Sequence, residues 1–148
     1  MASAVRKLKS SACSQPRSYC FLSFNARSLF NKLEELELLI KRYEPFIIFV
    51  QETWCLPNEP ASLYNIPNYL FFRRDRSGRP GGGVAIYLQS ESIETAERRL
   101  DLECEDTEAL WLSVSPKSEN AQKLLLCCIY RPPNTDITPF LSNFSRSL

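Results

Sequence analysis

Short apolar runs recur along the chain and predict a mixed α and β fold. Between the first two runs, apolar side chains recur every three or four positions over residues 29–43, which predicts an amphipathic helix. Residues 89–107 are charged and are assigned no element. Near the end of the chain, Thr138 and the following Pro139 predict the N-cap and first position of a second helix. The runs typical of buried strands are residues 19–24, 46–50, 69–72, 84–88, 109–114 and 124–130.

The first strand, the helix and the second strand form a unit that brings two polar residues together. Acidic residues lie near the start of the helix and basic residues at its end, which matches the helix dipole, and Pro45 stops the helix. A strand–helix–strand connection of this kind is right-handed and makes the two strands parallel. Asn25 and Glu52 are therefore expected side by side at the carboxyl edge of the sheet, where open α/β sheets bind ligands.

Glu52 and Asn25 are the first candidates for chemistry. Taken alone, an acid at a strand end also fits a solvated strand terminus or a cap for the next turn. The neighbouring Asn25 favours a ligand site, because its amide can orient a carboxylate or a phosphate. Mg²⁺ is held by one or two carboxylates with waters and substrate phosphates, so one glutamate can suffice when a phosphate binds.

Tyr130 and Asn134 flank a turn that two prolines make rigid. The segment fits a core aromatic followed by a stiff loop, and it equally fits a turn that faces Asn25 and Glu52. Both interpretations remain open at this point.

A segment rich in arginine and glycine, residues 73–83, holds all four glycines of the chain. It fits an exposed hairpin with charges for solubility. It also fits a contact with a phosphate backbone, because guanidinium groups suit phosphate and glycines allow close approach. The patterns GxGxxG and GxxxxGK[ST] of nucleotide-binding loops are absent. Its arginines are Arg73, Arg74, Arg76 and Arg79.

The composition fits one globular domain and excludes several kinds of catalysis. Of 148 residues, 24% are charged and 44% hydrophobic, and no apolar run approaches the ~20 residues of a membrane span. The net charge is +1, so any nucleic-acid contact must be local. Six cysteines without a CxxC pair favour reduced thiols in an intracellular compartment. The absence of histidine excludes Ser-His-Asp and Cys-His catalysis within this chain.

Four motifs together resemble a known family. They are SFNARSLFNKLEEL, PFIIFVQETW, NYLFFRRDRSGRPGGGVAIYL and IYRPPN. In this order and spacing they resemble the endonuclease/exonuclease/phosphatase superfamily, and more narrowly the apurinic-type endonuclease domain of non-LTR (LINE-like) retrotransposon polyproteins. The resemblance covers about residues 19–148. It implies an α/β (α+β) fold, the N-terminal part of a four-layered α/β/β/α sandwich with two packed mixed β-sheets.

The resemblance also implies an activity, which is Mg²⁺-dependent (or Mn²⁺-dependent) cleavage of a DNA phosphodiester to prime reverse transcription. Glu52 matches the family's metal-ligand glutamate, and Asn25 matches the asparagine that supports the metal and phosphate site. Tyr130 matches the active-site tyrosine, and Asn134 matches the asparagine after it. Arg27 joins the four arginines of the glycine-rich segment as a nucleic-acid contact. DNA as partner, a downstream reverse transcriptase and a nuclear location are expected from the family, and no membrane association is expected.

The chain also departs from the family pattern. The family's Asp-x-Asn segment and its terminal Asp-His pair have no match in this sequence. We therefore expect a truncated domain at residues 19–148, after a basic disordered tail or a targeting segment at residues 1–18, and no DNA nicking by this polypeptide alone. Two other functions remain open: a non-catalytic nucleic-acid-binding or decayed retroelement fragment, and a phosphoesterase of the same superfamily that acts on a small phosphate or a lipid.

Overall fold

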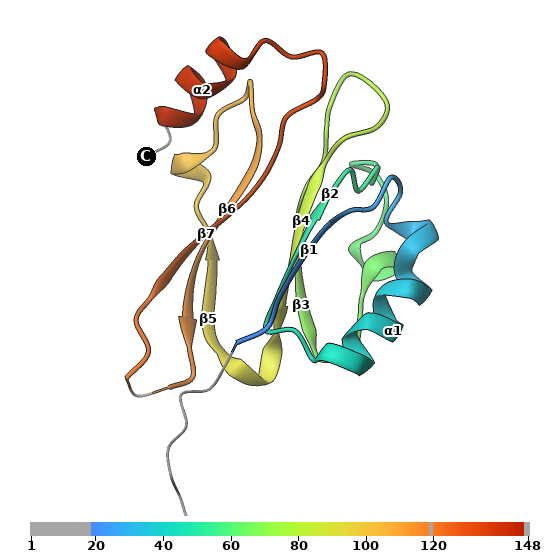
Figure 1. Cartoon of the computed structure of the whole chain (residues 1–148), viewed down its shortest axis with the longest axis vertical. Coiled ribbons are helices and arrows are strands. Elements are labelled where there is room, and N and C mark those ends of the chain that lie inside the picture. The colour runs from blue at the N-terminus through green and yellow to red at the C-terminus, as the bar shows by residue number, and fades with distance from the viewer. Residues whose placement is uncertain (1–18, 119, 147–148) are drawn as a thin grey trace, which may run out of the picture.

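Two β-sheets face each other in the structure, a computed structural model that describes residues 19–118 and 120–146 (Figure 1). The mixed sheet has the strand order β1-β2-β4-β3, and the antiparallel sheet has the order β5-β6-β7. The strands are β1 (Phe21–Asn25), β2 (Ile47–Gln51), β3 (Tyr69–Arg74), β4 (Val84–Gln89), β5 (Ile93–Arg98), β6 (Glu108–Pro116) and β7 (Leu124–Tyr130). The helices are α1 (Leu33–Tyr43) and α2 (Ile137–Ser145), with short 3-10 turns at Phe30–Lys32, Ala61–Tyr64, Ser90–Ser92 and Leu100–Leu102.

The predicted strand–helix–strand unit is present as β1, α1 and β2. The two strands are parallel, and Asn25 lies opposite Gln51, so Asn25 and Glu52 reach the same sheet edge. Helix α1 ends at Tyr43, and the C-cap residue Glu44 has a φ of 44° and donates its N–H to the Ile40 carbonyl oxygen at 2.8 Å. The α-helix begins four residues later than residue 29, because Leu29 is fixed by a backbone hydrogen bond of 2.8 Å to Thr53.

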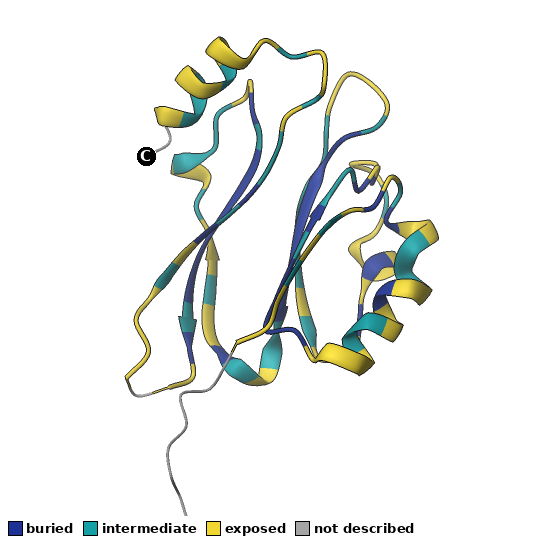
Figure 2. Cartoon of the chain, viewed as in Figure 1, coloured by how far each residue is buried: buried dark blue, intermediate teal, exposed yellow. Residues whose placement is uncertain are grey.

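The core lies in two layers, one on each face of the mixed sheet. Between the sheets, Ile86 and Leu88 of β4 pack with Leu110 and Leu112 of β6. On the other face, Tyr87 of β4 and its neighbours pack beneath α1. Because both faces of β4 are covered, its apolar run is continuous rather than alternating, and it is buried throughout most of its length (Figure 2). Each buried aliphatic side chain contributes about 1.5–3 kcal/mol, so these layers fix the strand ends that carry the site.

The predicted fold class is confirmed, with differences in detail. Only one of the two sheets is mixed; the other is antiparallel, because its consecutive strands are joined by loops without a crossover helix. Strand β5 lies in the charged segment that was assigned no element; only Ile93 of this edge strand is buried, so no apolar run marks it. The predicted cap of the last helix is wrong by two residues. Helix α2 is capped by Asp136, whose Oδ1 accepts the Thr138 N–H at 3.0 Å, because an Asp side chain caps as well as a Thr.

Helix α2 lies against the antiparallel sheet, where Phe144 stacks on Trp111 with ring centroids 5.8 Å apart. The predicted tail, residues 1–18, lies outside the described residues. Within the described part of the chain, no helix has both the length and the apolar character needed to span a membrane.

Candidate functional site

Glu52 and Tyr130 meet at one end of the sandwich, one from each sheet. Glu52 follows β2 and Tyr130 closes β7, and the Tyr130 hydroxyl donates a hydrogen bond to Glu52 Oε1 at 2.5 Å. Both side chains are half-buried. Two polar residues that the sequence places at separate strand ends are thus in direct contact.

Asn25 completes this group from the end of β1. Its Oδ1 accepts the backbone N–H of Arg27 at 3.2 Å. Its side chain also lies close enough to Glu52 to lower the pKa of that carboxyl, as expected of an amide that presents its N–H groups to a carboxylate. Asn25, Glu52 and Tyr130 therefore form one polar cluster.

Electrostatics keep Glu52 ionised and Tyr130 protonated. The Tyr130 hydroxyl, and after it the Asn25 amide, lowers the pKa of Glu52 against the opposing effect of burial, and Arg27 and Arg76 lower it further by their charge. The same hydrogen bond raises the pKa of Tyr130, with burial and the Glu52 charge acting in the same direction. At neutral pH the cluster therefore presents a carboxylate anion whose orientation is fixed by neutral donors.

The backbone around Glu52 is strained. Glu52 has a φ of 52° and Ser28, on the facing loop, has a φ of 96°, although neither is glycine. The two loops are joined because the Ser28 N–H donates to the Glu52 carbonyl oxygen at 3.1 Å. Such conformations cost about 1–3 kcal/mol each and cluster at functional sites. The strain here lies at the residue predicted to bind metal.

The run Gly81, Gly82 and Gly83 binds the loop after Glu52 through backbone hydrogen bonds. Thr53 N–H donates to the Gly83 carbonyl oxygen at 3.2 Å. A Cβ at Gly83, whose φ is 80°, would lie 2.5 Å from Thr53 Oγ1, and a Cβ at Gly82, whose φ is 69°, would overlap the Arg76 guanidinium. Both positions thus need glycine for space as well as for backbone conformation.

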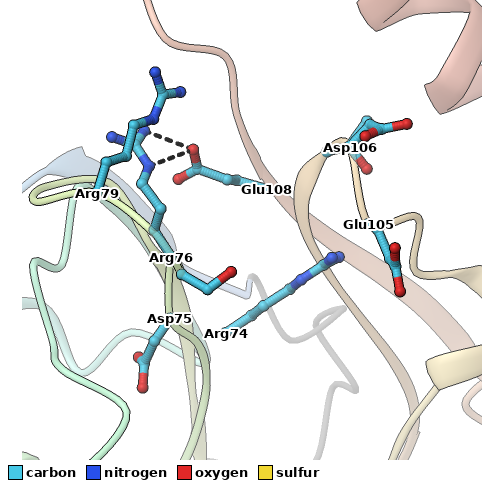
Figure 3. A pocket seen from close by; sticks show the side chains of 9 residues that line it. Arg74, Asp75, Arg76, Arg79, Glu105, Asp106 and Glu108 are labelled. Carbon is cyan, nitrogen blue, oxygen red and sulfur yellow. Dashed lines mark hydrogen bonds and ion pairs between the residues drawn. The ribbon is translucent and has the colours of Figure 1, made fainter.

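Glu108 is a site residue that the sequence reasoning missed. It accepts from Arg76 Nε at 2.7 Å (Figure 3). It also accepts from the Gly83 N–H at 2.8 Å, and it lies opposite Tyr130 in the β6–β7 register. The held Arg76 guanidinium lies 5.9 Å from the centroid of the Tyr130 ring. Residues two apart on a strand point to the same face, so the core residue Leu110 could have placed Glu108 on the face of β6 that meets the other sheet. The hydrogen-bond partners of Glu108, however, depend on tertiary packing.

Most of the predicted nucleic-acid contacts are engaged within the protein. Arg73 donates to the carbonyl oxygens of Leu56 and Glu59, at 3.2 Å and 2.7 Å. Arg74 donates to two carbonyl oxygens beside the antiparallel sheet, at 2.8 Å and 2.7 Å. Arg27 and Arg79 are exposed and, within residues 19–118 and 120–146, form no ion pair. The nucleic-acid role of all five arginines, including the paired Arg76, stays a prediction.

A cleft of about 620 Å³ lies beside this cluster, between the segment after β3 and the start of β6 (Figure 3). The wall after β3 carries three arginines and one aspartate, and the wall at the start of β6 carries three acids, so the cleft has mixed charge. Its lining residues are Arg74, Asp75, Arg76, Ser77, Arg79, Glu105, Asp106, Thr107 and Glu108.

Asn134 stands apart from the other predicted site residues. It is exposed in the turn after β7, where the Thr135 N–H donates to the Pro132 carbonyl oxygen at 3.0 Å. Among the residues described, its side chain makes no hydrogen bond with Asn25, Glu52 or Tyr130. The structure therefore joins three of the four predicted catalytic or metal-binding residues.

The donor chemistry of the cluster fits a hard divalent cation completed by other oxygens. In the described part of the chain, no group of three or more His, Cys, Asp or Glu side chains converges. Glu52 supplies one ionised carboxylate, while Glu108 is already held by Arg76 and Gly83. Mg²⁺ commonly takes one or two carboxylates and fills its remaining positions with waters and phosphate oxygens. Glu52 fits such a ligand when a phosphate is present.

Comparisons with solved structures find similar folds. The chain is similar to the endonuclease domain of TRAS1, a telomere-specific non-LTR retrotransposon, with 15% identity, a TM-score of 0.63, and 86% of this chain and 52% of that chain covered. It is similar to the human Nocturnin catalytic domain with bound sulfate anion, with 14% identity, a TM-score of 0.59, and coverages of 86% and 54%. It is also similar to ANGEL2, a 2',3'-cyclic phosphatase, with 18% identity, a TM-score of 0.51, and 78% of this chain and 41% of that chain covered.

These likenesses concern the fold, and the chain spans between 41% and 54% of the length of those structures. No curated protein matches the chain. The model of the Endonuclease/Exonuclease/phosphatase family matches residues 22–110, more than half of the 148 residues, and this confirms the family predicted from the four motifs. The chain belongs to the Endonuclease/Exonuclease/phosphatase family.

Proposed function

We propose that Asn25, Glu52 and Tyr130 bind a DNA phosphodiester together with Mg²⁺, as part of an endonuclease that nicks a target site for retrotransposition. The observation that carries the proposal is the hydrogen bond from Tyr130 to the ionised Glu52 carboxylate. The likeness of the fold to the TRAS1 endonuclease domain supports it.

Each residue of the cluster has a distinct part in this proposal. Glu52 would hold the cation, which would supply Lewis-acid polarisation of a phosphate oxygen. Tyr130 orients the carboxylate through its hydrogen bond, as partners of metal ligands commonly do, and Asn25 helps to keep it ionised from the end of β1. Arg27 and Arg76 place positive charge beside Glu52, which favours the approach of a phosphate anion.

We further propose that the 148-residue polypeptide does not nick DNA by itself. Hydrolysis needs a group that activates the attacking water. The chain has no histidine. Two acids near the site, in the part of the chain that the structure describes, are already paired: Glu108 with Arg76, and Asp75 with Arg73. Glu105 and Asp106 also line the cleft, but within the described part of the chain neither forms a hydrogen bond with Asn25, Glu52 or Tyr130. We therefore propose that no described acid is held against the cluster as a base for the attacking water.

Fluorescence anisotropy of a labelled DNA oligonucleotide tests the cation site. We expect Mg²⁺ to tighten DNA binding by the native chain, and we expect Glu52→Gln to remove this dependence. Glu91→Gln, which changes an exposed acid of the Ser90–Ser92 turn, is the matched control and should keep it. Equal binding in Mg²⁺ and in chelator would overturn the proposal.

A nicking assay on supercoiled plasmid tests the second part. The native chain should leave the plasmid intact in Mg²⁺. Mg²⁺-dependent nicking that Glu52→Gln abolishes would refute the proposed inactivity while supporting the cation site. The reverse transcriptase expected in the same element is part of the proposal as well, and the coding DNA downstream of the Leu148 codon tests it.

A non-catalytic nucleic-acid-binding role is the second candidate, and the exposed Arg27 and Arg79 favour it. Phosphate contacts by these side chains predict binding that falls steeply with salt but does not depend on Mg²⁺. Replacing both arginines with glutamine should reduce such binding. Displacement of DNA by adenosine 2',3'-cyclic phosphate would instead favour a phosphoesterase that acts on small phosphates.

A further inference from the structure

Trp54 is a large aromatic side chain that stands exposed two residues beyond Glu52. It is 47% exposed, whereas Trp111, the other tryptophan of the chain, is 3% exposed. An exposed indole loses the stabilisation that its burial would give. Its position at the rim of the Glu52 cluster therefore calls for a physical account.

The backbone holds this indole in a defined place. Trp54 has a φ of 56°, and its N–H donates to the Gly82 carbonyl oxygen at 2.9 Å. The preceding Thr53 is buried, 2% exposed, and is bound to Gly83 in the same way. The loop is thus fixed by the glycine run, and the tryptophan is directed outward from a rigid base.

The indole also lies close to the charged groups of the site. Trp54 Nε1 and Arg76 Nη1 lie 3.5 Å and 3.8 Å from the point that a Cβ at Gly81 would occupy. The Arg76 guanidinium in turn lies 5.9 Å from the centre of the Tyr130 ring, whose hydroxyl binds Glu52. Trp54 and Arg76 therefore both lie against Gly81, and Arg76 in turn lies beside the Tyr130–Glu52 pair.

We propose that Trp54 is a stacking platform for a nucleobase of the DNA strand whose phosphate binds at Glu52 and Tyr130. The inference rests on the proposed function and adds how the substrate is held beyond its phosphate. Every nucleobase has a π-face, so stacking on an indole binds an unpaired base whatever its identity. The exposed Arg79, on the segment that leads into the glycine run, supplies a positive charge for an adjacent phosphate.

Two single-stranded oligonucleotides of about ten nucleotides test the inference, because this length spans a typical binding site. One carries bases throughout, and the other has the same length and charge but consists of abasic nucleotides. We expect the native chain to bind the base-containing strand roughly tenfold more tightly, a ratio that corresponds to about 1.4 kcal/mol. Binding should also quench tryptophan fluorescence, and Trp54→Phe should remove that signal because Trp111 is buried.

Substitutions at the same position complete the test. Trp54→Ala should lose the roughly tenfold preference for bases, and Trp54→Phe should keep most of it because a phenyl ring still stacks. Tyr43→Ala removes an exposed aromatic at the end of α1 and serves as the matched control, with the preference unchanged. Far-UV circular dichroism and thermal melts verify that each variant is folded.

The outcomes separate this inference from the function on which it rests. Equal affinity for the two oligonucleotides, or full affinity of Trp54→Ala, overturns the stacking role even where Mg²⁺-dependent binding through Glu52 persists. A preference for bases that depends on Trp54 but not on Mg²⁺ or Glu52 supports stacking and counts against the proposed cation site. Binding of neither strand overturns the stacking inference, and a Mn²⁺ titration of the native chain against Glu52→Gln then reports separately on the cation site.

Discussion

Arg76 and Glu108 form an ion pair of 2.6 Å that ties the segment after β3 to the start of β6. Their side chains are only 13% and 18% exposed. The Glu108 carboxylate also accepts the Gly83 N–H, so one side chain fixes both the guanidinium beside Tyr130 and the end of the glycine run. The geometry of the site therefore depends on a residue that does not contact Glu52.

Glu108→Gln should destabilise the protein by about 2–3 kcal/mol, between the values for exposed and fully buried pairs. The substitution leaves the Arg76 charge largely buried without its counter-ion. Urea unfolding followed by circular dichroism measures the change. Glu105→Gln is the control, because Glu105 lines the same cleft, is exposed, and forms no ion pair among the described residues. It should shift stability by less than about 0.5 kcal/mol, and an equal effect of both variants would contradict the prediction.

Tyr130→Phe should raise the pKa of Glu52 toward its ordinary value, because the Tyr130 hydrogen bond is the largest cause that lowers it. An NMR titration of the Glu52 side-chain carboxyl carbon measures this directly. Tyr69→Phe provides the comparison, since the Tyr69 hydroxyl donates to the distant Pro45 carbonyl oxygen at 2.6 Å. Unchanged titration of Glu52 in Tyr130→Phe would show that the hydrogen bond does not control the carboxylate.

The stability contribution of Glu52 ionisation should depend on pH in one direction. The pKa of Glu52 is lower in the folded than in the unfolded chain, so the folded state favours the charged form. The resulting stabilisation is present above the ordinary pKa of a glutamate and is lost as the pH falls through the lower, folded value. In the Glu52→Gln variant the free energy of unfolding should therefore decrease less as the pH falls through this acidic range. Urea unfolding at successive pH values measures this, and a pH dependence identical to that of the native chain would contradict the prediction.

Gly82→Ala should be more damaging than Gly78→Ala, although both glycines have a positive φ, 69° and 79°. A Cβ at Gly78 meets nothing within 4 Å, so that variant reports only the backbone cost, about 1 kcal/mol. A Cβ at Gly82 also displaces the Arg76 guanidinium and hence the Glu108 pair. Thermal or urea unfolding of the two variants isolates this contact, and equal losses would mean that Arg76 relaxes freely.

The parts of the fold that could be predicted from sequence are those in which local pattern and burial coincide. Both faces of β2 and β4 are covered, and their continuous apolar runs reveal them. The approach of Asn25 to Glu52 follows from the parallel crossover, whose handedness is fixed by chain geometry. Edge strand β5 escaped prediction because its partners lie on one side and its outer residues are charged.

Only those site residues that lie at the ends of apolar strands could be predicted from the sequence. Glu52 and Tyr130 each close an apolar run, so both could be found. Glu108 could not, because its role arises from the β6–β7 register and from Arg76, 32 residues away. The same packing explains why Arg73 and Arg74, which composition marks as an exposed basic segment, donate to backbone carbonyl oxygens instead.

The left-handed backbone at Glu52 and Trp54 has a consequence for engineering this protein. Glycine at either position would relieve the unfavourable conformation, at φ values of 52° and 56°, and redesign for thermal stability alone would select it. Such a redesign would remove the carboxylate and the indole together. The strained backbone and the proposed substrate contacts therefore fall at the same two positions, and a more heat-resistant version of this chain should be sought at other sites.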